Sequence, residues 1–145
     1  VILKMKIVIL LALLAVVFGY NAIEHNNGHE ILRELEAGNH NVYVVFFYAE
    51  ATEGSGLANR NKDYEDTLLS NVLENNPDFS YAKVDARDSN YDELVTTVGI
   101  NVNELQKSPS ILIMEHGNGA WIHGPETISK LIEYAPAYSQ RSSNA

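Results

Sequence analysis

The run of residues 41–49, NVYVVFFYA, constrains the fold of this chain more than any other part of its sequence. It is almost entirely apolar, and its β-branched and aromatic side chains favour a strand over a helix. A strand with one face in water would alternate polar and apolar residues, whereas this strand needs apolar cover on both faces. We therefore expect it inside a sheet, with other elements packed above and below it.

The rest of the chain supplies elements that could provide this cover. Strands are expected at residues 22–25, 41–49, 79–86, 108–115 and 120–123, and helices at 27–38, 57–75, 89–99 and 125–136. Strands that are joined through helices imply right-handed crossovers and parallel pairing. The sequence therefore predicts an α/β fold with a central mixed, mostly parallel sheet, an antiparallel C-terminal hairpin, and helices on both faces.

Capping and breaking residues place several of these helix ends. Asn27 with Glu30, and Ser89 with Asp92, have the spacing of capping boxes. Pro136 is expected to end the last helix. We therefore predict one domain at residues 20–135, followed by a flexible tail at 136–145.

The first nineteen residues have the pattern of a secretory signal peptide. A basic start at Lys6 precedes a short apolar run, and the small residues Val17 and Gly19 fit a cleavage site before Tyr20. A short N-terminal membrane anchor is the alternative, although a spanning helix needs about 20 apolar residues. Secretion, or retention in the lumen of the endoplasmic reticulum, is expected; anchoring through this segment would instead place the chain at a membrane.

Composition excludes several classes of function. The chain has 145 residues, a formal net charge of −9 and no cysteine. Without cysteine there is no disulfide, no thiolate metal site and no thiol catalysis. An acidic chain also lacks the basic surface that nucleic acids require, so nucleic acid is not an expected partner. No cofactor is expected.

Four stretches resemble the thioredoxin fold, and most closely the thioredoxin-like domains of the protein disulfide isomerase family. FYAEATEGS resembles the family's stretch with two active-site cysteines, YAKVDA its second central strand, TTVGINVNELQKSPSILIM the segment with its cis-proline, and WIHGPETISKLIEY its glycine turn and last helix. The resemblance implies this fold for nearly all of the chain after the signal segment. It also implies a cis peptide bond between Ser108 and Pro109.

The active-site residues of that family are replaced in this sequence. Thr52 and Ser55 stand at the two cysteine positions, and Ala51 replaces a tryptophan. Phe46 replaces a buried acid that serves the thiols, so Lys83, which matches a lysine near that acid, is expected to have turned to a neighbouring carboxylate. A hydroxyl cannot take over thiol exchange, because its pKa lies far above the reach of such a site. The resemblance therefore implies a redox-inactive protein that is not an enzyme.

Other chemistry is not favoured by the sequence. Ser55 is not in a nucleophile elbow, because Glu53 stands where that motif has a glycine. The histidines at positions 25, 29, 116 and 123 are expected to be exposed loop or hairpin residues, since a metal site needs three or four converging ligands. No metal site is therefore predicted. The acidic stretch 85–93 does not match a calcium-binding EF-hand loop, which leaves at most weak calcium binding at about millimolar concentration.

Partner binding is the function that the sequence favours. We expect a binding module or an accessory subunit that engages a protein partner in a groove beside Pro109, where the fold presents unpaired backbone groups of Ser108 to an extended segment. The expected groove residues are Ala51, Thr52, Ser55, Ser108, Pro109 and Gly124. The alternatives are an acidic calcium-buffering protein and a membrane-anchored structural subunit of a larger complex.

Overall fold

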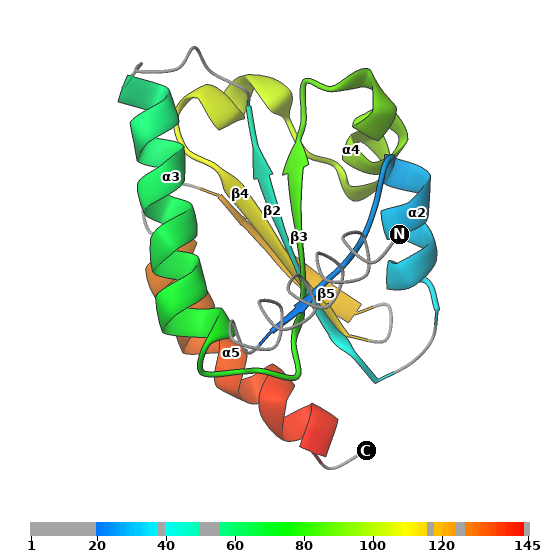
Figure 1. Cartoon of the computed structure of the whole chain (residues 1–145), viewed down its shortest axis with the longest axis vertical. Coiled ribbons are helices and arrows are strands. Elements are labelled where there is room, and N and C mark those ends of the chain that lie inside the picture. The colour runs from blue at the N-terminus through cyan, green and yellow to red at the C-terminus, as the bar shows by residue number, and fades with distance from the viewer. Residues whose placement is uncertain (1–19, 38–39, 50–55, 116–117, 124–126, 144–145) are drawn as a thin grey trace, which may run out of the picture.

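The computed structural model describes residues 20–37, 40–49, 56–115, 118–123 and 127–143 (Figure 1). The proposed signal segment, residues 1–19, lies outside this part of the chain. Among the described residues, no helix has the length and apolar character that crossing a membrane requires.

Five strands form one mixed sheet in the order β1-β3-β2-β4-β5. They are β1 (Asn21–Ala22), β2 (Val42–Tyr48), β3 (Ser80–Asp85), β4 (Ser110–Glu115) and β5 (Asn118–His123). β3 pairs in parallel with both β1 and β2, whereas β4 pairs antiparallel with β2 and with β5. The antiparallel part of the sheet thus begins at β4, one strand earlier than the expected hairpin edge.

Helices cover both faces of the sheet, as the apolar strand at its centre requires (Figure 1). They are α2 (Gly28–Leu35), α3 (Gly56–Leu68) with a π-helical turn η1 (Leu69–Leu73), α4 (Asp92–Val98) after the short turn η2 (Ser89–Tyr91), η3 (Val102–Gln106) and α5 (Thr127–Ser143). α2 and α4 pack on one face, and α3, η1 and α5 pack on the other. The order of strands and helices along the chain agrees with the sequence prediction.

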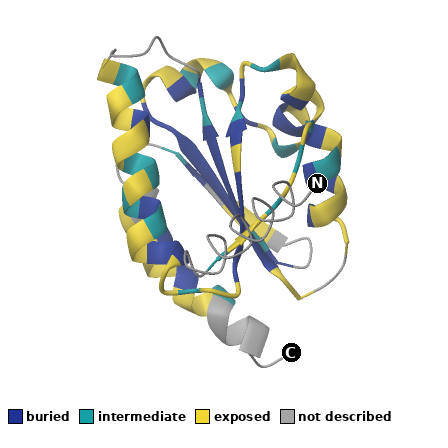
Figure 2. Cartoon of the chain, in the orientation of Figure 1, coloured by how far each residue is buried: buried dark blue, intermediate teal, exposed yellow. Residues whose placement is uncertain are grey.

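β2 is the buried centre of this three-layer arrangement. Residues 42–47 are all buried, and their side chains alternate between the two hydrophobic clusters on either side of the sheet (Figure 2). The expectation that this strand has apolar cover on both faces is confirmed.

Two predicted helix ends differ from the structure. Pro136 lies inside α5, which continues to Ser143, so the expectation that Pro136 ends the helix is wrong. That residues 136–145 are flexible stays a prediction. Ala135 is buried and Tyr138 packs partly against the same cluster, and this packing holds the helix together across the proline. The cap before α4 is also displaced, because Asp88, rather than Ser89, accepts the hydrogen bond that opens η2.

Candidate functional site

The predicted site lies where β2 ends at Tyr48 and the chain leads to α3. Residues 50–55 of this connection, and Gly124 after β5, lie outside the described residues. The structure therefore does not place four of the predicted positions, which are Ala51, Thr52, Ser55 and Gly124. It does place Phe46, Ser108 and Pro109.

Ser108 and Pro109 lie directly before β4, and both are buried. The backbone N–H of Ser108 donates to the carbonyl oxygen of Glu104 at 3.4 Å, so the expectation of unpaired backbone groups there is wrong for this donor. The expected cis bond is also wrong, since no peptide bond in the described part of the chain is cis. The trans form of an X–Pro bond is lower in free energy by about 0.5–1 kcal/mol, and only the resemblance favoured cis.

Phe46, which the resemblance places at the family's buried acid, is an aromatic ring in the hydrophobic core. Its side chain is fully buried, and its ring stacks on that of Tyr48 with 6.1 Å between centroids and 26° between the planes. Leu68 and Ile111 belong to the same hydrophobic cluster. Position 46 itself therefore offers no group that could accept or release a proton.

Lys83 lies opposite Phe46 in the register between β2 and β3, and its ammonium group is held by a carboxylate. Its Nζ donates to Glu65 Oε1 at 3.0 Å and lies 5.1 Å from the centroid of the Tyr48 ring. The expectation that Lys83 pairs with a neighbouring carboxylate is confirmed. The second oxygen, Glu65 Oε2, accepts a hydrogen bond of 2.7 Å from the hydroxyl of Tyr81. Burial, and then this bond to Glu65, raise the pKa of Tyr81.

A cleft of about 340 Å³ opens between α3 and these strands. Its most buried polar residue is Asn61, which the sequence analysis did not single out. Asn61 is 7% exposed, and its Nδ2 donates to the carbonyl oxygen of Ala49 at 3.3 Å. Its Oδ1 is buried and has no hydrogen-bond partner among the described residues. The cleft is lined by Phe46, Tyr48, Ala58, Asn61, Lys62, Glu65, Asp66 and Lys83.

His123, at the end of β5, contacts one residue before Pro109 and one residue after it in the chain. It is therefore not the exposed hairpin residue that was expected. Its Nδ1 lies 2.8 Å from the hydroxyl oxygen of Ser110, and its Nε2 lies 3.5 Å from Glu104 Oε2. The His123 side chain is 21% exposed. A serine, a histidine and a carboxylate thus adjoin, but Ser110 is buried within the sheet, where no substrate carbonyl can reach it. The arrangement joins β4, β5 and η3 and does not form a hydrolytic site.

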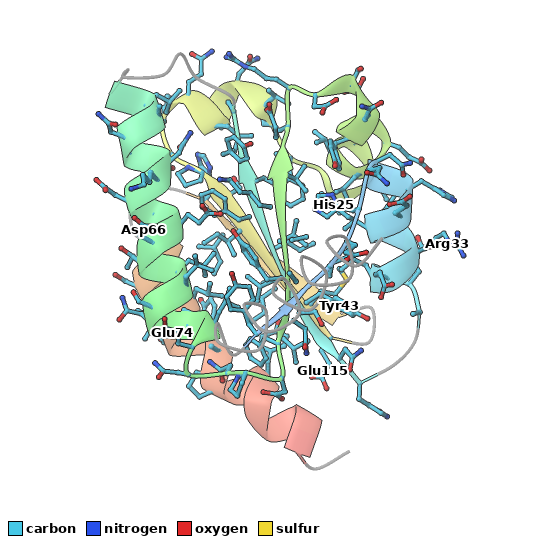
Figure 3. All side chains as sticks on the ribbon, in the orientation of Figure 1. His25, Arg33, Tyr43, Asp66, Glu74 and Glu115 are labelled. Atoms are coloured by element: carbon cyan, nitrogen blue, oxygen red, sulfur yellow. The ribbon has the colours of Figure 1, made fainter. Side chains whose placement is uncertain are left out.

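His25 is also less exposed than expected, because it packs against η2, the short turn before α4 (Figure 3). Its Nδ1 lies 2.8 Å from the Tyr91 hydroxyl, and the two rings meet edge to face. Burial lowers the pKa of His25, and the charge of Glu30 opposes this shift. Within the described ranges, no three or more histidine, aspartate or glutamate side chains form a group that could hold a metal ion. His116 lies outside those ranges.

Several thioredoxins of known structure superimpose on the chain. The thioredoxin of Trypanosoma brucei brucei has a TM-score of 0.58 at 17% identity, with 83% of this chain and 91% of that chain covered. The Schistosoma mansoni thioredoxin has a TM-score of 0.58 at 18% identity, with 83% and 96% covered. Spinach chloroplast thioredoxin f has a TM-score of 0.57 at 18% identity, with 82% of this chain and 92% of that chain covered. The fold is thioredoxin-like. No protein-family model matches the chain, and no curated protein matches its sequence.

The thioredoxin-like fold brings together some residues that the sequence singled out and adds others. Phe46 and Lys83 lie side by side, as the resemblance implied. Asn61 had a signal in the sequence that was not used. It stands four residues after Leu57 and three before Tyr64, on the helical face that the apolar residues of α3 define. A polar residue on the same helical face as these apolar residues points toward the core and is therefore expected to be buried.

Proposed function

We propose that this chain is a redox-inactive thioredoxin-like protein of the secretory pathway, similar to the domains of protein disulfide isomerases, that binds a protein partner. One observation supports the loss of redox chemistry most directly. The chain has no cysteine, and the position of the family's buried acid holds the fully buried ring of Phe46. A thiol protein that had lost its cysteines by a single accident would still have the acid. Here both parts of the chemistry are replaced.

The partner surface of this proposal is the connection after β2, together with the segment before β4. Ala51, Thr52 and Ser55 have small side chains, which would let another polypeptide approach the backbone closely. In the segment before β4, η3 and the end of β5 are held to the start of β4 through His123. A fixed scaffold of this kind lowers the entropic cost of ordering a binding surface. An extended segment of the partner would bind there through backbone hydrogen bonds.

The test is site-specific cross-linking in secretory cells. A photoreactive side chain at position 55 should capture a partner that the same group at Ser129, an exposed residue of α5, does not capture. Mass spectrometry of the captured chain also reports whether it begins near Tyr20. With the purified partner, Ser55→Trp should weaken binding at least about tenfold, while Ser129→Trp should change it less than about twofold. Equal capture at both positions, or equal affinities, would refute the proposed surface.

A further inference from the structure

β5 forms a sheet edge whose own sequence lacks the proline and the charged side chains by which proteins often protect such edges. It is the last strand of the sheet, and among the described strands it pairs with β4 alone. Its six residues, NGAWIH, include no proline and no formally charged side chain. The opposite edge, β1, has two residues and is protected by its shortness. Unprotected edges of this length accept a further strand through their outer N–H and C=O groups.

An apolar cleft of about 320 Å³ lies directly beside this edge. α2 supplies Leu32 and Leu35 to its walls, and β4 supplies Leu112 and Met114. Gly119 of β5 lies in the cleft too, and a Cβ at this position would collide with the carbonyl oxygen of Ile113. Gly119 has no side chain to place in the cleft. The cleft can therefore take one apolar side chain from a strand that pairs with β5.

The helices on this face carry excess negative charge. In α2 with the following Glu36, and in α4, there are five carboxylates and one guanidinium, which gives a formal charge of −4 (5 acids minus 1 base). Glu36 lines the cleft itself. Arg33 is the only lysine or arginine in these helices (Figure 3). The charge of the surroundings thus favours a basic segment.

We propose that the β5 edge binds an extended segment of another protein in which one apolar residue lies between basic residues two positions away on each side. Residues i and i±2 of a strand share one face. The apolar side chain would therefore enter the cleft while the basic side chains meet Glu36 and its acidic neighbours. A second copy of this chain is disfavoured, because each copy carries a net charge of −9.

This surface is separate from the partner surface of the proposed function. Pro109 precedes the first residue of β4, whereas Met114 lies near its other end, beside Glu115 (Figure 3). The two surfaces can therefore fail or succeed independently. Ser55→Trp should leave binding at the β5 edge unchanged.

The binding test uses a labelled peptide of the pattern Thr-Lys-Thr-Leu-Thr-Lys-Thr, titrated with the full chain by fluorescence anisotropy. Replacing both lysines by glutamates should weaken binding at least about tenfold. In an antiparallel pair, alternate residues direct their N–H groups to the same neighbour. N-methylation of one alternate set of peptide amides should therefore abolish binding, and N-methylation of the other set should leave it within about twofold. Equal effects of the two sets would overturn strand pairing.

A matched pair of variants locates the peptide on the protein. Thr97 lines the cleft, while its neighbour Thr96 is exposed on the same helix outside the lining. Thr97→Arg should weaken peptide binding at least about tenfold, and Thr96→Arg less than about twofold, although both add the same charge. Equal loss in both variants would show attraction by charge alone and overturn the proposal. A dimer in sedimentation velocity that Thr97→Arg dissociates would make a second copy the occupant and overturn it as well.

Discussion

At the scale of single residues, Glu65 connects Tyr81 and Lys83 in the site beneath α3. Its side chain is 17% exposed, and each carboxylate oxygen accepts one hydrogen bond, from the Tyr81 hydroxyl and from Lys83. Tyr81 is buried, whereas the Lys83 side chain is 46% exposed. Hydrogen bonds to charged groups in buried positions contribute more to stability than ion pairs whose partner is solvated. The tyrosine should therefore matter more than the lysine.

We predict that Tyr81→Phe lowers the free energy of unfolding by about 1.5–3 kcal/mol, because it leaves one oxygen of Glu65 without its donor. Lys83→Met should cost less than about 1 kcal/mol, since it keeps an apolar stem beside the ring of Tyr48 and removes a solvent-screened charge. Urea denaturation of the two variants beside the wild type measures both values. A larger loss for Lys83→Met than for Tyr81→Phe would contradict this ranking of the two interactions.

The first residues of two helices give a matched test at the scale of elements. Gly28 opens α2, and a Cβ there would lie 2.7 Å from Leu94 Cβ and 3.1 Å from the backbone N of Leu94. Gly56 opens α3, where a Cβ would have no atom of the described residues within 4 Å. α2 thus lies so close to α4 that a side chain at this contact must push the helices apart.

Gly28→Ala should accordingly lower the free energy of unfolding by about 1–3 kcal/mol through overpacking. Gly56→Ala should be neutral or slightly stabilising, because alanine has the higher helix propensity and meets no neighbour. Thermal or urea unfolding of both variants checks the difference. Equal stabilities would mean that α2 can shift away from α4 at little cost.

Sequence patterns predicted these elements well wherever the local signal and the tertiary packing agree. Residues 41–49 indicated a buried central strand because nearly every side chain is apolar, and β2 is buried along residues 42–47. Asn27 caps α2 through the N–H of Glu30, as the capping-box spacing predicted. Pro136 misled the prediction, because the penalty for a proline inside a helix is local, whereas the burial of Ala135 that outweighs it is tertiary.

At the scale of the whole molecule, the candidate site could be predicted only where the pairing of two neighbouring strands determines which residues meet. The placement of Phe46 beside Lys83 followed from the order of landmarks and from parallel pairing, and the structure has both. The burial of Asn61 could have been predicted from its place on the apolar face of α3, but its hydrogen bond to the Ala49 carbonyl could not, because Ala49 follows a different element, β2. The same holds for His123, whose partners Ser110 and Glu104 come from two other elements.

Whether the thioredoxin-like frame can support thiol chemistry is open to a direct test. The sequence positions 52 and 55 precede α3, which begins at Gly56. The N-terminus of a helix lowers the pKa of a nearby thiol and so favours the reactive thiolate. We therefore expect the double variant Thr52→Cys/Ser55→Cys to form an intramolecular disulfide with oxidised glutathione.

A pair of cysteines at the same spacing within α3, Asp63→Cys/Asp66→Cys, is the control, because both positions are exposed and lie beyond the first turn. The restored pair should oxidise at least about tenfold faster than this control and should reduce insulin, which the wild type cannot do without a thiol. Its turnover should remain slow, since Phe46 cannot relay a proton to the second cysteine as an acid would. Mass spectrometry of the oxidised variants and an insulin turbidity assay measure the two effects. If the two pairs oxidise at the same rate, positions 52 and 55 do not correspond to the family's cysteines, and the site assignment built on that correspondence is wrong.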